Sequence, residues 1–275
     1  MQVAVVGHVE WVEFVRVERV PQPGEIMHAL ETWEEAAGGG AVAAVQLAKL
    51  NGSALLFTSL GDDELGQRSR VELEAHGVTV HAAAAGVPQR RAFTYVDDRG
   101  ERTITVLGPK LVPSGDDASL PWAELARCDA AYFVSGDVSA VRAARRSRVL
   151  VAAARDLATL RRAEEEVDVL VGSGEDPGER FEPGELEPPP KIVVTTSGSL
   201  GGWVRPGGPF RAAPLLAPIE DSYGCGDSFA AGLTYALAAG GSMDDAVQFA
   251  ARCGAAVLTG RGAYAGQLGG GDFTL

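Results

Sequence analysis

Short, almost entirely apolar segments alternate with helix-like stretches along most of the sequence, and this alternation restricts the possible folds more than any other feature. A strand that is apolar on both faces has to be covered on both faces, as the strands of a parallel sheet are. Helical stretches between such strands supply the crossover connections that parallel pairing requires. The pattern therefore predicts an α/β fold with a doubly wound, mostly parallel sheet. The apolar runs lie at residues 3–6, 54–60, 130–134, 149–153, 167–171 and 192–195.

A predicted hairpin interrupts this alternation. Residues 92–96 and 102–106 are strand-like, and residues 97–100 between them have the composition of a turn. Residues 9–20 alternate apolar and charged side chains, which is typical of a strand with one wet face. We expect these segments to form a small accessory sheet. Helices are predicted from apolar periodicity and glycine boundaries at residues 41–49, 228–239 and 243–258.

The charge balance excludes several classes of function. The 275 residues include 37 acidic and 24 basic side chains, and the resulting net charge of -13 repels nucleic acid and anionic membranes. No stretch reaches the roughly 18 apolar residues of a membrane span, and the N-terminus lacks the features of a signal peptide. Three isolated cysteines without metal-type spacing indicate reduced thiols. We therefore expect a cytoplasmic protein that binds neither nucleic acid nor membrane.

A glycine motif within residues 221–229 directly precedes a helix-like stretch. Gly224 and Gly226 flank Cys225, which lets backbone N–H groups converge at a helix N-terminus, where unpaired donors and the helix dipole favour an anion. Asp227 follows at once. A carboxylate beside a bound phosphate is suited to accept a proton from an attacking hydroxyl. The motif therefore predicts phosphoryl transfer.

The same residues also allow a purely structural interpretation. Asp227 or Ser228 would then cap the helix, and Gly224 and Gly226 would only form a tight bend. We interpret Cys225 as a small apolar filler, since no activating base is evident near it in the sequence. No P-loop sequence is present, so a phosphate site would have to be built by another loop.

The motif resembles the C-terminal signature of the ribokinase or PfkB-type carbohydrate kinases, and further similar segments follow the family order along almost the whole chain. The resemblance implies a single kinase domain over residues 1–275, with a three-layer α/β/α core, a mostly parallel sheet and a small β lid. The lid would comprise residues near 10–33 and 88–107, and in many relatives it also forms a homodimer interface. The additional similar segments are residues 5–7, 23–25, 38–40, 60–66 and 193–201.

The resemblance also implies roles for individual residues. Asp227 would be the general base, ATP would be the donor, and the anion hole for the transferring phosphoryl group would comprise Gly224, Cys225 and Gly226. The nucleotide would contact Thr196, Gly198 and Gly201 along its phosphates, and Ala251, Gly254 and Ala255 around its adenine.

Two departures from the family pattern concern the acceptor. Glu10 stands where relatives have other polar ligands, and its carboxylate would accept hydrogen bonds from sugar hydroxyls. The helix entry Gly38, Gly39 and Gly40 lacks the usual substrate-binding Asn, so the acceptor would be a different polyol, a nucleoside or a bulkier molecule. Trp11 would either stack on the acceptor or pack within the lid.

A third departure concerns the metal. Ser173 and Asp176 stand where relatives have the Asn-x-x-Glu motif, and they would hold Mg²⁺ through water; a monovalent cation is left open. The sequence therefore predicts an ATP-dependent kinase that acts on a hydroxyl of a sugar or sugar-like small molecule. A nucleoside kinase is the alternative within enzymes. A non-catalytic sugar or nucleotide sensor is the alternative outside them, and the retained Asp227 argues against it.

Overall fold

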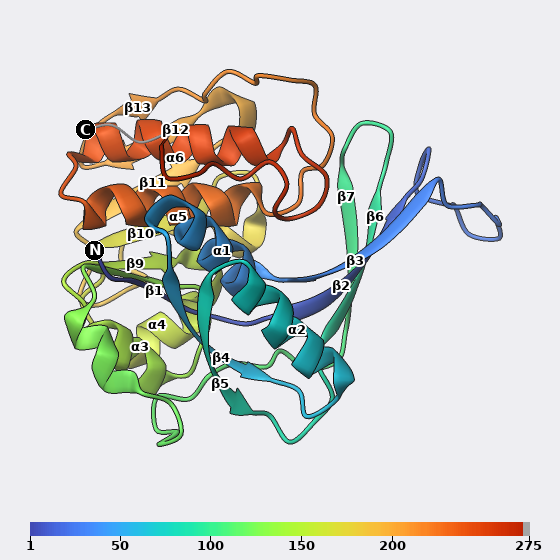
Figure 1. Cartoon of the computed structure of the whole chain (residues 1–275). Coiled ribbons are helices and arrows are strands. Elements are labelled where there is room, and N and C mark those ends of the chain that lie inside the picture. The colour runs from blue at the N-terminus through green and yellow to red at the C-terminus, as the bar shows by residue number, and fades with distance from the viewer. Residues whose placement is uncertain (272–275) are drawn as a thin grey trace.

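Within residues 1–271, which a computed structural model describes, the central sheet contains nine strands, seven of them parallel (Figure 1). Residues 272–275, the end of the predicted domain, lie outside the described part. The mostly parallel sheet confirms the predicted α/β class; that residues 1–275 form one domain stays a prediction. In sheet order the strands are β13 (Pro209–Phe210), β12 (Gly202–Arg205), β11 (Ile192–Thr196), β10 (Val169–Ser173), β9 (Leu150–Ala153), β8 (Ala130–Phe133), β1 (Val3–Val6), β4 (Ala54–Leu60) and β5 (Val78–Ala84).

Helices cover both faces of this sheet (Figure 1). In β1, Val3 and Val5 belong to one hydrophobic cluster, whereas Ala4 and Val6 belong to another, because successive side chains point to opposite faces. The resulting three-layer α/β/α core is the predicted one. The first cluster includes side chains of α1 (Gly39–Asn51), α2 (Glu64–Ala75), α5 (Cys225–Ala238) and α6 (Met243–Val257), and the second includes those of η1 (Trp122–Arg127), α3 (Val138–Ala144) and α4 (Leu157–Ala163).

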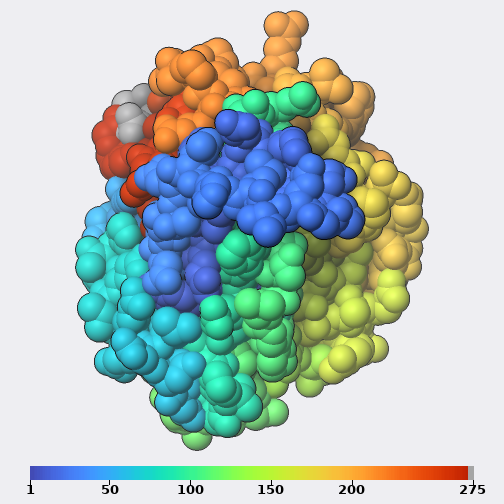
Figure 2. Space-filling model, turned by 90° about the vertical axis from the view of Figure 1, so that its right-hand side faces the viewer, coloured from blue at the N-terminus to red at the C-terminus, as the bar shows by residue number. Residues whose placement is uncertain are grey.

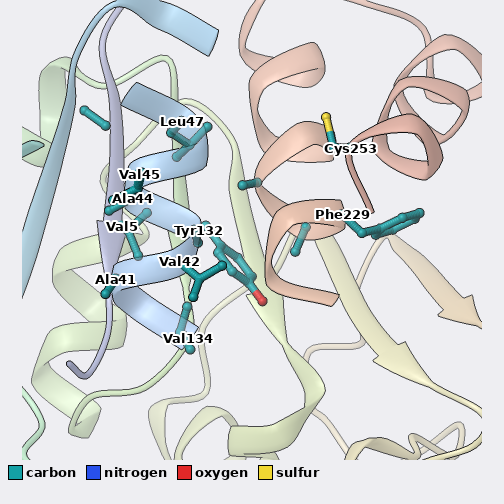
Figure 3. Packing of buried hydrophobic residues seen from close by; sticks show 14 of the residues in the cluster. Val5, Ala41, Val42, Ala44, Val45, Leu47, Tyr132, Val134, Phe229 and Cys253 are labelled. Carbon is teal, nitrogen blue, oxygen red and sulfur yellow. The ribbon is translucent and has the colours of Figure 1, made fainter. Parts of the chain in front are cut away.

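Helix α1 is buried along almost its whole length. Residues 40–48 and Leu50 are all buried, since the helix is packed between the sheet and α5. Its small side chains make this close packing feasible, and Val42, Val45 and Leu47 belong to the same core cluster as Phe229 of α5 (Figure 3). A helix held in this way gives its N-terminus a firmly defined position. None of the helices within residues 1–271 is both long and apolar enough to cross a bilayer.

A second sheet of four strands projects from the body as the lid (Figure 1). From the side it stands over the middle of one face of the molecule (Figure 2). The two inner strands pair in parallel and the outer pairs are antiparallel. The lid extends beyond the predicted residue 33, since β3 reaches Ala37; the glutamates and alanines of this strand are poor strand formers. In sheet order its strands are β3 (Glu31–Ala37), β2 (Glu10–Arg16), β6 (Arg91–Val96) and β7 (Arg102–Leu107).

The C-terminal segment that follows α6 is hydrogen-bonded to lid strand β3. The Ala263 N–H donates to the Glu35 carboxylate at 2.9 Å, and the Gly262 N–H donates to Asp221 at 3.0 Å. Burial raises the pKa of Glu35 to about 7, and the nearby carboxylates of Glu72 and Asp221 add to this effect. The folded protein therefore binds a proton at Glu35 more tightly than the unfolded chain does.

This shift predicts a pH-dependent stability. Between pH 4.5, the ordinary pKa of Glu35, and about 7, its folded value, the folded state holds more protons than the unfolded state, so the free energy of unfolding falls as pH rises. Glu35→Gln should remove about 1–2 kcal/mol of this fall, after allowance for the partial exposure of the side chain. Urea unfolding at pH 5 and pH 8 measures it.

Glu34→Gln is the matched control, because Glu34 is an exposed neighbour on the same strand. The control should keep the wild-type difference between the two pH values. An equal pH dependence in Glu35→Gln and the wild type would contradict the explanation.

Candidate active site

The predicted site residues lie where the parallel strands end. Strands β1, β8, β10 and β11 run in one direction, so their carboxyl ends meet at one edge of the sheet. His8 follows β1 and Ser135 follows β8, and the His8 Nδ1 lies 2.9 Å from the Ser135 hydroxyl oxygen. β1 lies between β8 and β4, where the winding of the sheet reverses. Such a switch point is where open α/β sheets bind ligands.

The glycine motif forms the start of α5. Gly224 is the N-cap residue with φ 77°, a left-handed conformation that favours glycine, and no side chain caps the helix there. Asp227 lies in the first turn. The capping interpretation of Asp227 and Ser228 is therefore wrong, since the boundary is three residues earlier. The first-turn N–H groups have no carbonyl partners within the helix and are available to an anion.

A second helix N-terminus faces Asp227. A methyl group on Gly39, the first residue of α1, would lie 2.8 Å from the Asp227 Oδ1. A methyl group on Gly40 would lie 2.6 Å from the His8 carbonyl oxygen, so only glycine allows this approach of two backbones. The Gly40 N–H donates to the same His8 carbonyl at 3.1 Å. The glycine entry thus brings the start of α1 against both the loop after β1 and the carboxylate on α5.

Glu10 begins the lid and is buried beside this helix entry. Its Oε1 lies 2.8 Å from Arg90 Nε and 3.8 Å from His8 Nε2. Burial raises the pKa of Glu10, and Arg90 and Lys110 oppose that rise. Burial, together with Lys110 and Arg90, lowers the pKa of His8 to about 3, so this imidazole is neutral. A methyl group on Gly38 would lie 3.1 Å from the Glu10 nitrogen, which places the predicted acceptor residues together.

The surroundings of Asp227 suit a base near neutral pH. Burial raises the pKa of its carboxyl to about 6, and the negative charge of Glu179 contributes. Arg102 and Arg155 act in the opposite direction, and Glu10 adds a smaller rise. A carboxyl with this pKa is mostly ionised at pH 7 and can take up a proton during a reaction.

The residues predicted for the nucleotide lie on the adjoining side. Thr196 ends β11, its hydroxyl donates to the Gly172 carbonyl at 3.2 Å, and the turn with Gly198 and Gly201 follows. On α6, a methyl group on Gly254 would lie 3.2 Å from the Cys225 carbonyl oxygen, so this helix packs on the start of α5. Ala251 is buried and Ala255 is half-buried on the same helix.

Ser173 and Asp176 are close together after β10. The Asp176 N–H donates to the Ser173 hydroxyl at 3.2 Å, and the Asp176 carboxylate accepts the Gly178 N–H at 2.8 Å and pairs with Arg155. Arg155 also pairs with Glu179 at 2.6 Å. Hydroxyl and carboxylate oxygens are the donors that Mg²⁺ prefers, so the chemistry of the set fits a water-mediated site. Within residues 1–271, no three potential ligands gather tightly enough to hold a metal directly.

Sequence reasoning missed several residues of this region. Arg102, on lid strand β7, donates to the Ser222 carbonyl directly before the glycine motif. The Tyr223 hydroxyl accepts the Gly38 N–H at 3.1 Å and so joins the motif to the start of α1. No motif marks Arg102, and although Tyr223 lies within residues 221–229, the sequence does not show its partner, because each contact joins elements far apart in the chain. The buried Trp11 has the Arg68 guanidinium 4.2 Å above its ring, so it packs within the protein.

Comparison with known proteins shows which protein family this chain belongs to. The sequence model of the pfkB family of carbohydrate kinases matches residues 1–172 and 183–268. The chain belongs to this family. The pfkB-family assignment makes the protein an ATP-dependent sugar kinase. The unmatched residues 173–182 run from the end of β10 across the short helix η3 (Pro177–Glu179) and include Asp176.

Individual relatives agree over nearly the full length. An ATP-dependent ribose-1-phosphate kinase from Halopiger xanaduensis is 29% identical over 282 residues, which cover 90% of this chain and 89% of the relative. The ribokinase of Arabidopsis thaliana, complexed with ribose and ATP, has a TM-score of 0.74 and 20% identity and covers 95% of this chain and 93% of its own. The adenosine kinase of Sinorhizobium meliloti has a TM-score of 0.75 and 20% identity, with coverages of 96% and 95%. Both structures share the fold of the pfkB-family kinase.

The contact at Gly39 yields a prediction for this pfkB-family kinase. With Asp227 as the predicted general base, Gly39→Ala should lower kcat by about 100-fold, because its methyl group displaces the Asp227 carboxylate, and a misplacement of about 1 Å has that effect. Gly208→Ala is the control, since a methyl group there meets no atom within 4 Å. ATP consumption with a panel of acceptors and the melting temperature are measured together. An unchanged kcat in Gly39→Ala would mean that Asp227 is not held against α1 during turnover.

Proposed function

We propose that this kinase transfers the γ-phosphoryl group of ATP to a hydroxyl of a sugar or sugar-like small molecule, with Asp227 as the general base. The main support is the position of the Asp227 carboxylate. It lies in the first turn of α5, and the glycine start of α1 leaves no room for a side chain against it. Two helix N-termini therefore provide positive ends beside the carboxylate and beside any phosphate bound there.

In the proposed step, the acceptor oxygen forms a bond to the γ-phosphorus while the bond from that phosphorus to the bridging oxygen breaks. The hydroxyl proton moves to an Asp227 oxygen, and ADP leaves with the electron pair of the broken bond. Because the pKa of Asp227 is about 6, the carboxylate is both largely ionised and basic enough at neutral pH. Positioning and charge stabilisation supply the rest of the catalysis.

The backbone of Gly224, Cys225 and Gly226 is proposed to stabilise the transferring phosphoryl group. Gly226 is exposed, and a methyl group on it would meet no atom within 4 Å, so the space in front of it is open to a ligand. Arg102 adds a positive charge from the lid. Burial raises the pKa of the Cys225 thiol, which argues against a nucleophilic role for it.

The nucleotide is proposed to lie along Thr196, Gly198 and Gly201, with its adenine against α6. Ser173 and Asp176 are proposed to hold Mg²⁺ through water, as their oxygen chemistry allows. When bound with ATP, Mg²⁺ neutralises charge on the phosphate oxygens. Arg155 already pairs with Asp176, so the arginine would share this carboxylate with the hydrated ion.

Glu10 is proposed to bind the acceptor. Its Oε1 is paired with Arg90, and Oε2 has no hydrogen-bond partner among the described residues, so it can accept from an acceptor hydroxyl. The names of the relatives include ribose-1-phosphate, ribose and adenosine, so they do not select one acceptor. Membership of a kinase family and the presence of Asp227 support an enzyme over a sensor.

A homodimer through the lid is also proposed, because the lid forms a homodimer interface in many members of the family. The surface of the lid supports this proposal. Strand β7 is an exposed edge strand, and Ile104, Val106 and Leu107 are 40%, 43% and 43% exposed. An exposed edge with apolar side chains is able to pair with a second chain.

Asp227→Asn should lower kcat by about two to four orders of magnitude, because the amide cannot accept the hydroxyl proton. ATP affinity should change little, since the amide is nearly isosteric. Asp116→Asn is the control, since Asp116 is an exposed aspartate in a loop. Steady-state kinetics and nucleotide binding measure both effects, and full turnover in Asp227→Asn would remove Asp227 from the mechanism.

The pKa of Asp227 also predicts the acid limb of the pH profile. The base acts only when it is ionised, so kcat/KM should fall below about pH 6 and reach about one tenth of its plateau at pH 5. The residual activity of Asp227→Asn should lack this limb. A wild-type profile that stays flat down to pH 4.5 would assign the proton transfer to another group.

A further inference from the structure

Lys110 stands apart from the other lysines of the protein. The sequence has three lysines. Lys49 donates to the Tyr264 carbonyl, and Lys191 pairs with Glu166 at 2.6 Å and with Asp168 at 2.9 Å. Lys110 is exposed and has neither a hydrogen bond nor an ion pair within residues 1–271. An unpaired ammonium group at a functional site is available to an anionic ligand.

The guanidinium of Arg90 likewise has hydrogen-bond donors without partners within the described residues. Its side chain is only 13% exposed, and its charge is paired with Glu10 through Nε. The Nε is buried without a well-formed hydrogen bond, and the two terminal nitrogens have no hydrogen-bond partner within the described residues. A largely buried guanidinium normally uses most of its five N–H donors. The unpaired N–H donors of Arg90 can therefore bind a ligand.

The strand register of the lid brings these two cations to one place. Arg91 is opposite Leu107 in the β6–β7 pair, so the preceding Arg90 and the following residues 108–110 flank the same end of the hairpin. Trp11 is opposite Arg91 in the β2–β6 pair, so Glu10 begins its strand at that end as well. This end is the root of the lid.

The root of the lid adjoins the proposed base. Glu10 is opposite Ala37 in the β2–β3 pair, and Gly38 and Gly39 continue directly into α1. A methyl group on Gly38 would touch Glu10, and one on Gly39 would touch Asp227. Two consecutive glycines thus separate the Glu10–Arg90 pair from the Asp227 carboxylate. An acceptor in reach of Asp227 is in reach of the root of the lid.

From this arrangement we propose that the acceptor is a sugar that already carries a phosphate monoester, which Arg90 and Lys110 bind at the root of the lid. The proposal rests on the proposed kinase function and names the substrate class of that site. The hydroxyl that reacts faces Asp227, and the existing phosphate lies on the other side of the two glycines. The product would carry two phosphates, so a reaction that makes sugar monophosphates must supply the substrate.

The charges around the root favour a dianion over a neutral sugar. Lys110 and Arg90 supply two positive charges; Glu10 offsets that of Arg90 through one of its carboxylate oxygens, and the negative charge of Asp156 acts on Lys110 without an ion pair to it among the described residues. Desolvation lowers the pKa of Lys110; Asp156 and Glu10 oppose this, whereas Arg90 and Arg155 add to it. Arg155 is already paired with Asp176 and Glu179. In a protein of net charge -13, such a local cationic pair selects an anionic ligand against the field of the whole chain.

The missing substrate amide agrees with this assignment. The helix entry at residues 38–44 has only glycine, alanine and valine, so α1 offers no side-chain ligand for a sugar hydroxyl. Charge-assisted hydrogen bonds to a phosphate are roughly twice as strong as neutral ones and would replace that lost recognition.

The test uses the full-length enzyme with Mg²⁺ and ATP. Ribose 1-phosphate and glucose 1-phosphate leave the primary hydroxyl free, and each is compared with its free sugar and with gluconic acid. The variants are Lys110→Met and Arg90→Lys. The second variant keeps the positive charge of Arg90 but loses the paired N–H donors of its guanidinium. The matched controls are Lys191→Met, at the opposite ends of the strands, and Arg91→Met, the next residue, which pairs with Glu13 on the exposed side. Asp227→Asn reports on chemistry in every assay.

We expect kcat/KM for a sugar phosphate to exceed that for its free sugar by at least about tenfold. Lys110→Met and Arg90→Lys should each lower the value for the sugar phosphate by about 10- to 100-fold, mainly through KM, and by at least about tenfold more than they lower the value for the free sugar. The two controls should retain the preference. Because Lys110 is exposed, its variant should fold even if a substitution of the largely buried Arg90 does not; melting temperatures verify this.

Other outcomes separate the two proposals. Asp227-dependent turnover that favours a free sugar or gluconic acid would overturn the phosphate proposal and leave the kinase mechanism intact. A preference for sugar phosphates that survives Lys110→Met would overturn the assignment of the phosphate to the root of the lid. Product formation that is unaffected by Asp227→Asn would overturn the proposed function, and an absence of product from every acceptor would overturn both.

Discussion

The site depends on one close approach between two pieces of backbone. The start of α1 lies directly against the loop after β1, where a methyl group on Gly40 would come within 2.6 Å of the His8 carbonyl. Because α1 is buried along most of its length, its N-terminus cannot retreat from this contact. The same approach brings Gly39 against the Asp227 carboxylate. The position of the proposed base thus follows from the packing of an apolar helix and from the absence of side chains at its first turn.

The lid is connected to this contact through its strand register. Glu10 begins β2, Arg90 directly precedes β6 and Lys110 follows β7, and in-register pairing places all three at one end of the small sheet. The C-terminal segment holds that sheet through Glu35, and its Gly262 N–H donates to Asp221, shortly before the start of α5. Arg102, further along the lid, reaches back to the carbonyl before the glycine motif. The buried core therefore positions the proposed base, and the lid with its flanking residues adds positive charge around the proposed acceptor site through Arg90, Lys110 and Arg102.

Much of the fold and part of the site could be predicted, and the reason differs from one feature to the next. The parallel strands were predictable because burial on both faces leaves uninterrupted apolar runs, as in residues 3–6. The glycine motif was predictable because phosphate chemistry restricts the residues that form it. Strand β3 was not predicted as a strand, and the expected lid region ended near residue 33, since its glutamates and alanines carry little strand preference. Arg102 and Tyr223 were missed, because each acts on a residue about 120 or more positions away.

The sequence by itself determined the α/β class, six of the parallel strands, the hairpin, the glycine-bounded helix starts and the carboxylate that follows the glycine motif. These features are local, since periodicity, turn residues and short motifs act over a few neighbouring positions. Only the tertiary structure decided that Asp227 is not a helix cap, that it faces Gly39, and that Arg90 and Lys110 share the root of the lid with Glu10. These facts depend on helix packing and strand register, which bring distant residues together and which no local pattern encodes.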